Sequence, residues 1–301
     1  LRVAAWYRKL GRDDDAEGRY RRILERLPEC EAALEALEDI YRRGNAFEPL
    51  TGVLVRRAEL INDIMERREL WATVAQLRED ALDDIPGAIE AWRGVLDADD
   101  VDSRALEALS RLYEQEQGWE DLLEVVTRLA PLADDTERRA ELRLRAASLQ
   151  REHLDDLQGA VDAYRDVLDL DPQHGAAMDG LEAVQRQRED WAAVEEVLLR
   201  RLEGKEGGER IEVFEALATL SANELESSAS AVGYLQQILD EEPRHQGAFA
   251  QLETLLERDE QWYDLIELRR KQAGMLLGDA DNDASVRKLV TVARVWTDHL
   301  E

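Results

Sequence analysis

Three aspartates near the end of the chain have the spacing of the first ligands of a calcium loop. They are Asp279, Asp281 and Asp283, and carboxylate oxygens are ligands that Ca²⁺ prefers. Such a loop needs a glycine at its sixth position and a glutamate at its twelfth. This chain has Ala284 and Val290 there. The sequence therefore favours a solvated acidic turn over a calcium site.

The histidines and the cysteine lack the partners that metal binding or nucleophilic catalysis would need. No two histidines are four residues apart, the spacing that places two zinc ligands on one side of a helix. Cys30 is the only cysteine and has no histidine nearby in the sequence, so we expect a structural thiol and no disulfide framework. The histidines fall near expected helix ends or turns and are His153, His174, His245 and His299.

The other polar patterns also favour structure over catalysis. The run GKEGG at 204–208 lacks the preceding strand and the spacing of a phosphate-binding loop, so we interpret it as a linker. Because the chain has 68 Asp and Glu residues, pairs of carboxylates occur throughout it and identify no acid–base site. We predict no catalytic, cofactor-binding or metal-ligating residue. The chain is not expected to be an enzyme or to need a cofactor.

The composition and charge exclude several kinds of partner. The formal net charge is −29, whereas nucleic acids and anionic membrane surfaces are bound by clustered Lys and Arg. No stretch approaches the roughly 18 to 20 apolar residues that cross a bilayer. We therefore predict no nucleic acid partner and no membrane insertion, and we attribute the charge to solubility. The lack of cysteine pairs is compatible with a cytoplasmic location, with the periplasm as an alternative.

The strongest signal in the sequence is an internal repeat of about 72 residues. A period of this length suits two helical hairpins of about 34 to 38 residues each. One hairpin cannot bury its apolar faces alone, so stacked hairpins share a core. Spacings of 72, 72 and 71 residues separate the members of four series: Phe47, Trp119, Trp191 and Trp262; Pro28, Asp100, Pro172 and Pro243; Leu37, Leu109, Leu181 and Leu252; and Leu10, Leu82, Leu154 and Leu225.

Apolar residues at helical spacing between these positions predict an all-α chain. We expect about 17 helices, in eight antiparallel hairpins and half of a ninth, with no strand. They should form one continuous solenoid over 1–301. Because the sequence begins with Leu1 inside a helix and stops inside another, we expect it to be a piece of a longer protein. The expected hairpins are 1–28, 29–65, 66–100, 101–135, 136–172, 173–207, 208–243 and 244–281, followed by the half-hairpin 282–301.

The first hairpin resembles the tetratricopeptide repeat (TPR). The positions that the family fills with large, small and aromatic residues, Gly, Ala and Pro read Val3, Ala4, Tyr7, Gly11, Ala16, Tyr20, Ile23 and Pro28. Later hairpins keep the second half of this pattern, in Ala88, Trp92 and Val95 and in Ala160, Tyr164, Val167 and Pro172. Leu50, Arg57 and Asp83 depart from it. The chain is therefore similar to a divergent TPR array of bacterial type.

The resemblance implies a right-handed superhelix whose concave groove is lined by the first helix of each hairpin. TPR proteins act through protein–protein binding, so we expect a scaffold that holds a protein or an extended peptide in this groove. TPR clamps for peptide carboxylates use Lys and Asn, and the chain has only four of each, so no such clamp is predicted. The candidate groove residues are Glu35, Asp39, Arg42, Arg43, Arg104, Glu107, Arg111, Glu114, Asp179, Arg186, Glu257 and Arg258.

Two interpretations of these groove residues stay open. Arginine–carboxylate pairs with a partner can give specificity, or the residues can form a solvated face with pairs four residues apart along one helix. A second function also stays open, a spacer or assembly platform whose open ends stack on neighbouring domains or on further copies of the chain. The sequence does not identify the partner.

Large residues at the repeat positions are expected to form the core. For a buried tryptophan, we expect Trp191→Ala to cost about 3–5 kcal/mol of stability. The expected core positions are Leu37, Phe47, Trp92, Leu109, Trp119, Tyr164, Leu181, Trp191, Leu252 and Trp262.

Overall fold

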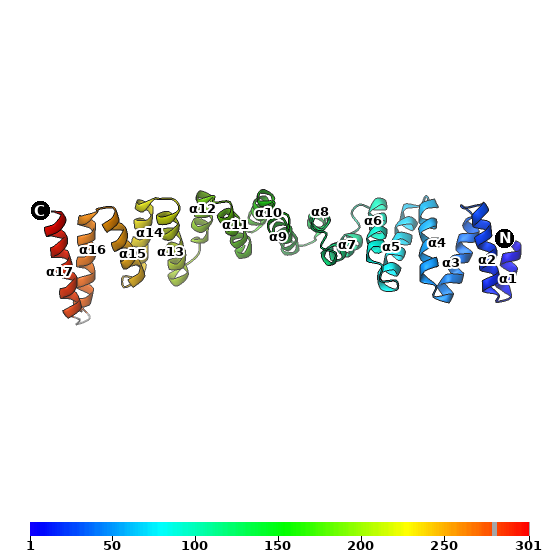
Figure 1. Cartoon of the computed structure of the whole chain (residues 1–301), viewed down its shortest axis with the longest axis horizontal. Helices are drawn as coiled ribbons and strands as arrows, with labels where there is room; N and C mark the ends of the chain where they lie inside the picture. Colours follow the sequence, from blue (N-terminus) through cyan, green and yellow to red (C-terminus); the bar gives the residue numbers. More distant parts are fainter. Residues whose placement is uncertain (279–281, 301) are drawn as a thin grey trace. The chain divides into compact units, whose positions relative to one another are not determined.

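The computed structural model describes residues 1–278 and 282–300, and over these ranges it contains α-helices and no strand (Figure 1). The predicted all-α fold is confirmed, as is the expected number of about 17 helices. The helices are α1 (Arg2–Lys9), α2 (Asp13–Arg26), α3 (Glu31–Gly44), α4 (Phe47–Leu60), α5 (Ile64–Asp80), α6 (Ile85–Ala98), α7 (Ser103–Gln115), α8 (Trp119–Leu129), α9 (Thr136–Glu152), α10 (Leu157–Leu170), α11 (Gly175–Gln187), α12 (Trp191–Arg201), α13 (Gly207–Asn223), α14 (Ser228–Glu241), α15 (Gln246–Arg258), α16 (Trp262–Gly278) and α17 (Asn282–His299), with a 3-10 helix η1 (Ala130–Leu132) after α8.

The chain divides into two compact units. Unit 1 is Leu1–Leu170 and contains α1 to α10; unit 2 is Asp171–Glu301 and contains α11 to α17. Within each unit, every helix packs against the helices before and after it in the chain. This is the arrangement of a helical repeat, in which each element contacts only its neighbours. The single continuous solenoid over 1–301 stays a prediction.

The 72-residue period corresponds to a long hairpin followed by a short one. Helices α5 and α6 have 17 and 14 residues, and α7 and α8 have 13 and 11. The same four lengths recur in α9 to α12. Helices α13 to α15 follow with 17, 14 and 13 residues, and α16 is extended to 17. The repeating unit is therefore four helices, because neighbouring hairpins differ in length.

The turns inside the hairpins repeat with the same period. The turns of the short hairpins each contain a residue with positive φ, at Asn45, Gln117, Glu189 and Glu260. The turns of the long hairpins do so at Asp83, Asp155 and Glu226. Asn and Asp adopt this left-handed conformation more readily than other non-glycine residues. Gln and Glu do not favour positive φ, so at Gln117, Glu189, Glu226 and Glu260 the packing of the flanking helices must stabilise the turn.

Side chains at repeat positions also cap the helices. Asp84 and Asp156 begin the second helices of two long hairpins and accept hydrogen bonds from Gly87 and Gly159 N–H at 3.1 and 2.9 Å. Asp102, His174 and His245 are 72 and 71 residues apart and cap α7, α11 and α15. For the histidines, the acceptor is Nδ1. Two of the four histidines therefore have a structural role that their position at helix starts explains.

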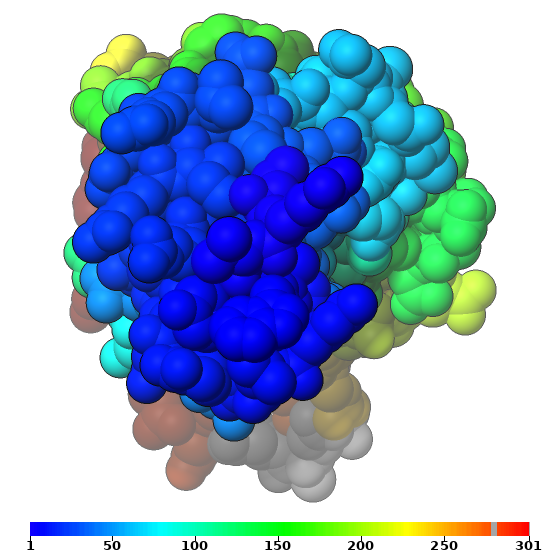
Figure 2. Space-filling model, turned by 90° about the vertical axis from the view of Figure 1, so that its right-hand side faces the viewer, coloured from blue at the N-terminus to red at the C-terminus, as the bar shows by residue number. Residues whose placement is uncertain are grey.

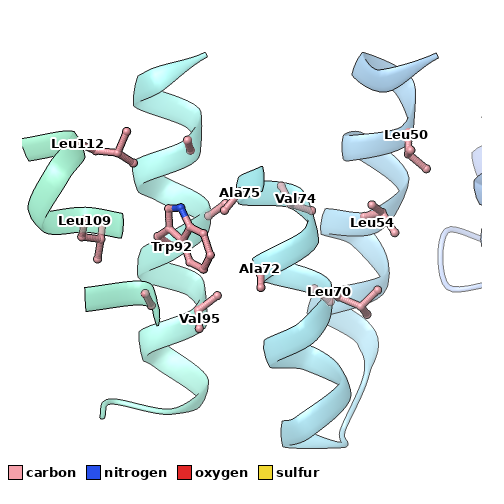
Figure 3. Close-up of a cluster of buried hydrophobic side chains, with 14 of the residues drawn as sticks. Leu50, Leu54, Leu70, Ala72, Val74, Ala75, Trp92, Val95, Leu109 and Leu112 are labelled. Carbon is pink, nitrogen blue, oxygen red and sulfur yellow. The ribbon is translucent and has the colours of Figure 1, made fainter. Parts of the chain in front are cut away.

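The core consists of leucine, valine, alanine and aromatic side chains between consecutive helices. Figure 3 shows this for α4 to α7, where Ala75 of α5 points toward Trp92 of α6. Both side chains are buried, as are Leu54 and Leu109 in the neighbouring helices. Of the ten expected core positions, six are buried: Leu37, Trp92, Leu109, Tyr164, Leu181 and Leu252.

The other four expected core positions are half-buried instead: Phe47, Trp119, Trp191 and Trp262. Each is the first residue of a helix, next to the turn that joins two helices, so it is covered on one side only. In two cases, a histidine from the next hairpin lies on the exposed ring. The ring centroids of Trp119 and His153 are 3.9 Å apart, and those of Trp262 and His299 are 3.8 Å apart.

The N-terminal end of unit 1 has an apolar surface. Figure 2 views this end, with α1 and α2 in the darkest blue. In the three later repeats, the first helix of the long hairpin has 17 residues, whereas α1 has eight. Large apolar side chains in and next to α1 are exposed, and they are Leu1, Val3, Trp6 and Leu10.

Candidate binding surface on the odd-numbered helices

In unit 1, ion pairs join odd-numbered helices that are not consecutive in the chain. Arg8 of α1 pairs with Asp39 of α3. Arg111 of α7 has its Nη2 atom 2.5 Å from Oε1 of Glu79 in α5. The odd-numbered helices therefore share one surface, the odd-helix face. In unit 1 we define it by Arg8, Asp39, Glu69, Glu79, Arg104, Ser110, Arg111, Glu114 and Arg145.

From α5 to α9, the pairs all run in one direction, from an arginine to a carboxylate of the preceding odd-numbered helix. Arg104 of α7 reaches back to Glu69 of α5, with 3.1 Å between Nη2 and Oε1. Arg145 of α9 reaches back to Glu114 and Ser110 of α7, at 2.8 and 3.0 Å. The result is a ladder of arginine–carboxylate pairs from α5 to α9.

The ladder is mostly exposed and therefore weak, although the side chains of Glu79 and Arg145 are partly covered, at 18% and 34% exposed. The side chains of Arg104, Arg111 and Glu69 are more than half exposed, and such pairs are each worth about 0–1 kcal/mol. A hydrogen bond to Asp102, the cap of α7, raises the pKa of Arg104. These arginines keep their charge and can exchange one carboxylate partner for another at little cost.

Unit 2 has a polar pocket on its odd-numbered helices, with a volume of about 350 Å³. Arg186 of α11 lies at one side, and Gln251 of α15 at the other. Between them, α13 supplies Glu215, Thr219 and Asn223. With Glu224, which also lines it, the pocket offers a cation, two carboxylates and two amides. The amides can both donate and accept hydrogen bonds, so they can bind the N–H and C=O groups of a peptide backbone.

The remaining groove candidates of unit 2 pair within a helix or with an even-numbered helix. Arg186 pairs with Glu182 one turn earlier, at 2.9 Å. Asp179 pairs with Arg201 of α12 at 2.5 Å, and Glu257 pairs with Arg269 of α16. Arg258 bonds to Asp259 at 3.1 Å and to the Ser228 hydroxyl of α14 at 2.5 Å. Of the candidates in unit 2, Arg186 alone lines the pocket.

The candidates in α3 lie around a buried carboxylate that sequence reasoning missed. Glu38 is buried and pairs with Arg42 at 2.8 Å and with Arg57 of α4. Arg43 pairs with Asp13 of α2 at 3.4 Å and donates to the Asp39 carbonyl at 3.1 Å. Glu35 and Glu107 are exposed on α3 and α7. The candidates of α3 therefore contribute one residue, Asp39, to the odd-helix face.

The second helices carry a different polar motif. Arg21 of α2 donates to the Tyr41 hydroxyl at 2.9 Å, and Arg93 of α6 donates to the Tyr113 hydroxyl at 2.6 Å. Burial raises the pKa of both tyrosines. In unit 2, burial and a hydrogen bond to Glu195 raise the pKa of Tyr234 to about 12. These contacts fasten one hairpin to the next, so we assign them to the scaffold.

Sequence reasoning missed the contribution of the long first helices. It took candidates from α3, α7, α11 and α15, whereas α5, α9 and α13 supply Glu69, Glu79, Arg145 and Asn223. A signal for them is present, because polar residues recur among apolar ones along these helices at helical spacing. In α5, α9 and α13, however, the sequence matches the TPR pattern too weakly to assign each residue to a position in the repeat.

No group of three His, Cys, Asp or Glu side chains that could hold a metal ion occurs in residues 1–278 and 282–300. Two members of the acidic triplet, Asp279 and Asp281, lie outside the described residues. None of the described helices is long and apolar enough to cross a membrane.

The helix pairs, the recurring Ala and aromatic positions and the capped turns agree with one family. The profile of the tetratricopeptide repeat matches residues 141–174, most of the hairpin α9–α10. This hairpin of the chain matches the tetratricopeptide repeat family. The matching hairpin is the third long hairpin of the chain, whereas the resemblance noted in the sequence begins with residues 3–28. No curated protein matches the chain.

Solved structures with a similar arrangement of helices have low sequence identity to this chain. The MamA protein is 21% identical over 59% of this chain and 92% of its own, with a TM-score of 0.37. YrrB, described as a TPR protein with an unusual peptide-binding site, is 14% identical over 62% and 94%, with a TM-score of 0.37. PilF of Pseudomonas aeruginosa is 13% identical over 75% and 96%, with a TM-score of 0.32.

Proposed function

We propose that this chain is a non-enzymatic scaffold that binds a protein or an extended peptide on its odd-helix face. The observation that carries the proposal is the ladder of exposed, exchangeable arginine–carboxylate pairs from α5 to α9. A structural network would be buried, whereas the side chains of Arg104 and Arg111 stay more than half exposed. Arg111 pairs with Glu79, and Arg104 pairs with Glu69 and Asp102. Such arginines can transfer to the carboxylates of a partner at little cost.

The charges on this face favour a partner segment of mixed sign. Glu69, Glu79 and Glu114 would pair with Lys or Arg of the partner, while Arg104, Arg111 and Arg145 would pair with its Asp or Glu. The match of charges would set the register and specificity more than the affinity. In unit 2, the amides of Asn223 and Gln251 would bind the backbone of the partner independently of its sequence.

The test is capture of partners with three versions of the chain as bait. The first is the wild type. The second is the double variant Arg104→Glu/Arg111→Glu. The third, Arg12→Glu/Arg128→Glu, changes the charge equally on the even-numbered helices α2 and α8, at residues whose side-chain ion pairs are within their own helix. Circular dichroism and thermal unfolding establish that all three fold alike. The affinity of each captured protein is then measured by calorimetry with purified components.

We expect a partner that the wild type and the even-helix variant bind and that the ladder variant binds at least tenfold more weakly. Equal binding by all three versions would refute the proposal and place the contact elsewhere. Recovery of only further copies of the chain would instead favour the alternative function, an assembly platform.

A further inference from the structure

The last helix, α17, has two apolar faces, and one of them is exposed. Its first face packs on α16 through Val292 and Val295, which are buried. Its second face carries Val286, Leu289 and Trp296, with exposed fractions of 58%, 44% and 38%, and the exposed Ala293. We call these four residues the open face of α17. Leu289, Ala293 and Trp296 lie three, seven and ten positions after Val286, so the four residues follow one side of the helix.

The repeat identifies the equivalents of the open face elsewhere in the chain. His299 stacks on Trp262 as His153 stacks on Trp119, so each residue of α17 corresponds to the residue of α9 that lies 146 positions earlier. The equivalents in α9 are Ala140, Arg143, Ala147 and Gln150. Those in α13 are Ile211, Phe214, Ala218 and Ser221, and those in α5 are Arg68, Trp71, Ala75 and Arg78.

In all three earlier repeats, this face is covered. Ala75, Ala147 and Ala218, the equivalents of Ala293, are at most 1% exposed. The covering element is the second helix of the long hairpin. In α6, the Gly94 Cα is so near Trp71 that an added Cβ would lie 2.7 Å from the indole ring. In α14, the Tyr234 ring stacks on Phe214 with 6.3 Å between centroids.

A carboxylate near the C-terminal end of each covering helix binds an arginine of the helix that it covers. The distance is 2.9 Å between Arg68 and Asp99, 3.2 Å between Arg143 and Asp166, and 2.6 Å between Arg210 and Glu241. The C-terminal end of the covering helix therefore lies near the N-terminal end of the covered one, and the two helices are antiparallel. In α17, Arg287 is the exposed arginine in the corresponding turn.

We propose that the open face of α17 binds an antiparallel amphipathic helix of the same class as α6, α10 and α14. The helix would present a small or aromatic residue to Leu289, as α6 and α14 present Gly94 and Tyr234 to its equivalents Trp71 and Phe214. A carboxylate near its C-terminal end would pair with Arg287. This surface is separate from the odd-helix face, and its partner is a folded helix instead of an extended peptide.

The test uses the full chain and a labelled peptide with the sequence of residues 226–243, which includes α14. Binding is followed by fluorescence anisotropy. The chain is compared with Ala293→Glu, which places a charge in the middle of the open face. Its control is Arg294→Gln, which changes the charge by the same amount on another side of α17. A second peptide carries Tyr234→Glu at the position that contacts Phe214 in α14.

We expect saturable binding that Ala293→Glu and the Tyr234→Glu peptide each weaken at least tenfold, and that Arg294→Gln leaves within about twofold. No binding, or equal binding to Ala293→Glu, would overturn the proposal. Sedimentation that showed self-association lost in Ala293→Glu, without peptide binding, would also overturn it, because the occupant would then be a second copy. The Arg104→Glu/Arg111→Glu variant should bind the peptide normally, which separates this result from that of the proposed function.

Discussion

Leu109→Ala tests whether stability in unit 1 spreads only between neighbouring helices. Leu109 of α7 is 1% exposed and belongs to the core that joins α4 to α7. The substitution removes three buried carbon atoms at about 0.8 kcal/mol each. The cavity that remains raises the total cost to about 3–5 kcal/mol. If each helix contacts only its neighbours, this cost falls mainly on α6, α7 and α8.

Hydrogen exchange followed by mass spectrometry measures this distribution along the chain. A cost of about 3–5 kcal/mol increases the opening equilibrium by about 150- to 5,000-fold, so amides of α6 to α8 should exchange correspondingly faster. The effect should fall progressively toward α2 and α10. The control Leu132→Ala makes the same deletion at an exposed position and should change exchange by less than about threefold. A uniform loss of protection over α1 to α10 would refute the reasoning, because unit 1 would then unfold as one cooperative block.

Three further predictions concern single residues. Trp191→Ala should cost less than the 3–5 kcal/mol expected for a buried tryptophan, and clearly less than Trp92→Ala, because Trp191 is half-buried and Trp92 is 5% exposed; equal losses in denaturant unfolding would contradict this. Gln117→Gly should stabilise by about 0.5–1 kcal/mol, because glycine avoids the cost of a φ of 57° at that turn; a lower melting temperature would count against it. The Tyr234 phenol should titrate near pH 12. The stability that it contributes is therefore present below about pH 10 and is lost as the pH rises from about 10 through 12. Glu195→Gln should lower the pKa of Tyr234 in an ultraviolet or NMR titration, and an unchanged value would exclude the hydrogen bond as a cause.

The fold could be predicted from the sequence because the repeat determines it. Each series of equivalent residues is constrained by the same packing, so the 72-residue spacing and the helical spacing of apolar residues together predicted an all-α repeat of about 17 helices. The burial of Trp191 was overestimated for a local reason. Its position opens a helix, and a side chain there is covered only on the side toward its own hairpin.

The pairing of polar residues could not be predicted in the same way. Glu107 precedes Arg111 by four residues, which favours a pair within α7, yet Arg111 contacts Glu79 of α5. A long arginine side chain reaches several carboxylates of similar energy, and the choice depends on the distance between helices. Sequence spacing along one helix contains no information about that distance. The ladder and the polar pocket therefore became visible only in three dimensions.

The alternation of long and short hairpins limits how the length of this protein can change. Each 17-residue helix is covered by a 14-residue helix, and each 13-residue helix follows at a fixed place in the series. Deleting one hairpin, such as 101–135, would bring the long helix α9 against α6, where a short helix normally packs. Deleting or duplicating four helices would restore every contact. Gene duplication and recombination should therefore leave in-frame changes of about 72 residues in proteins of this architecture, and engineered arrays should be lengthened by the same step.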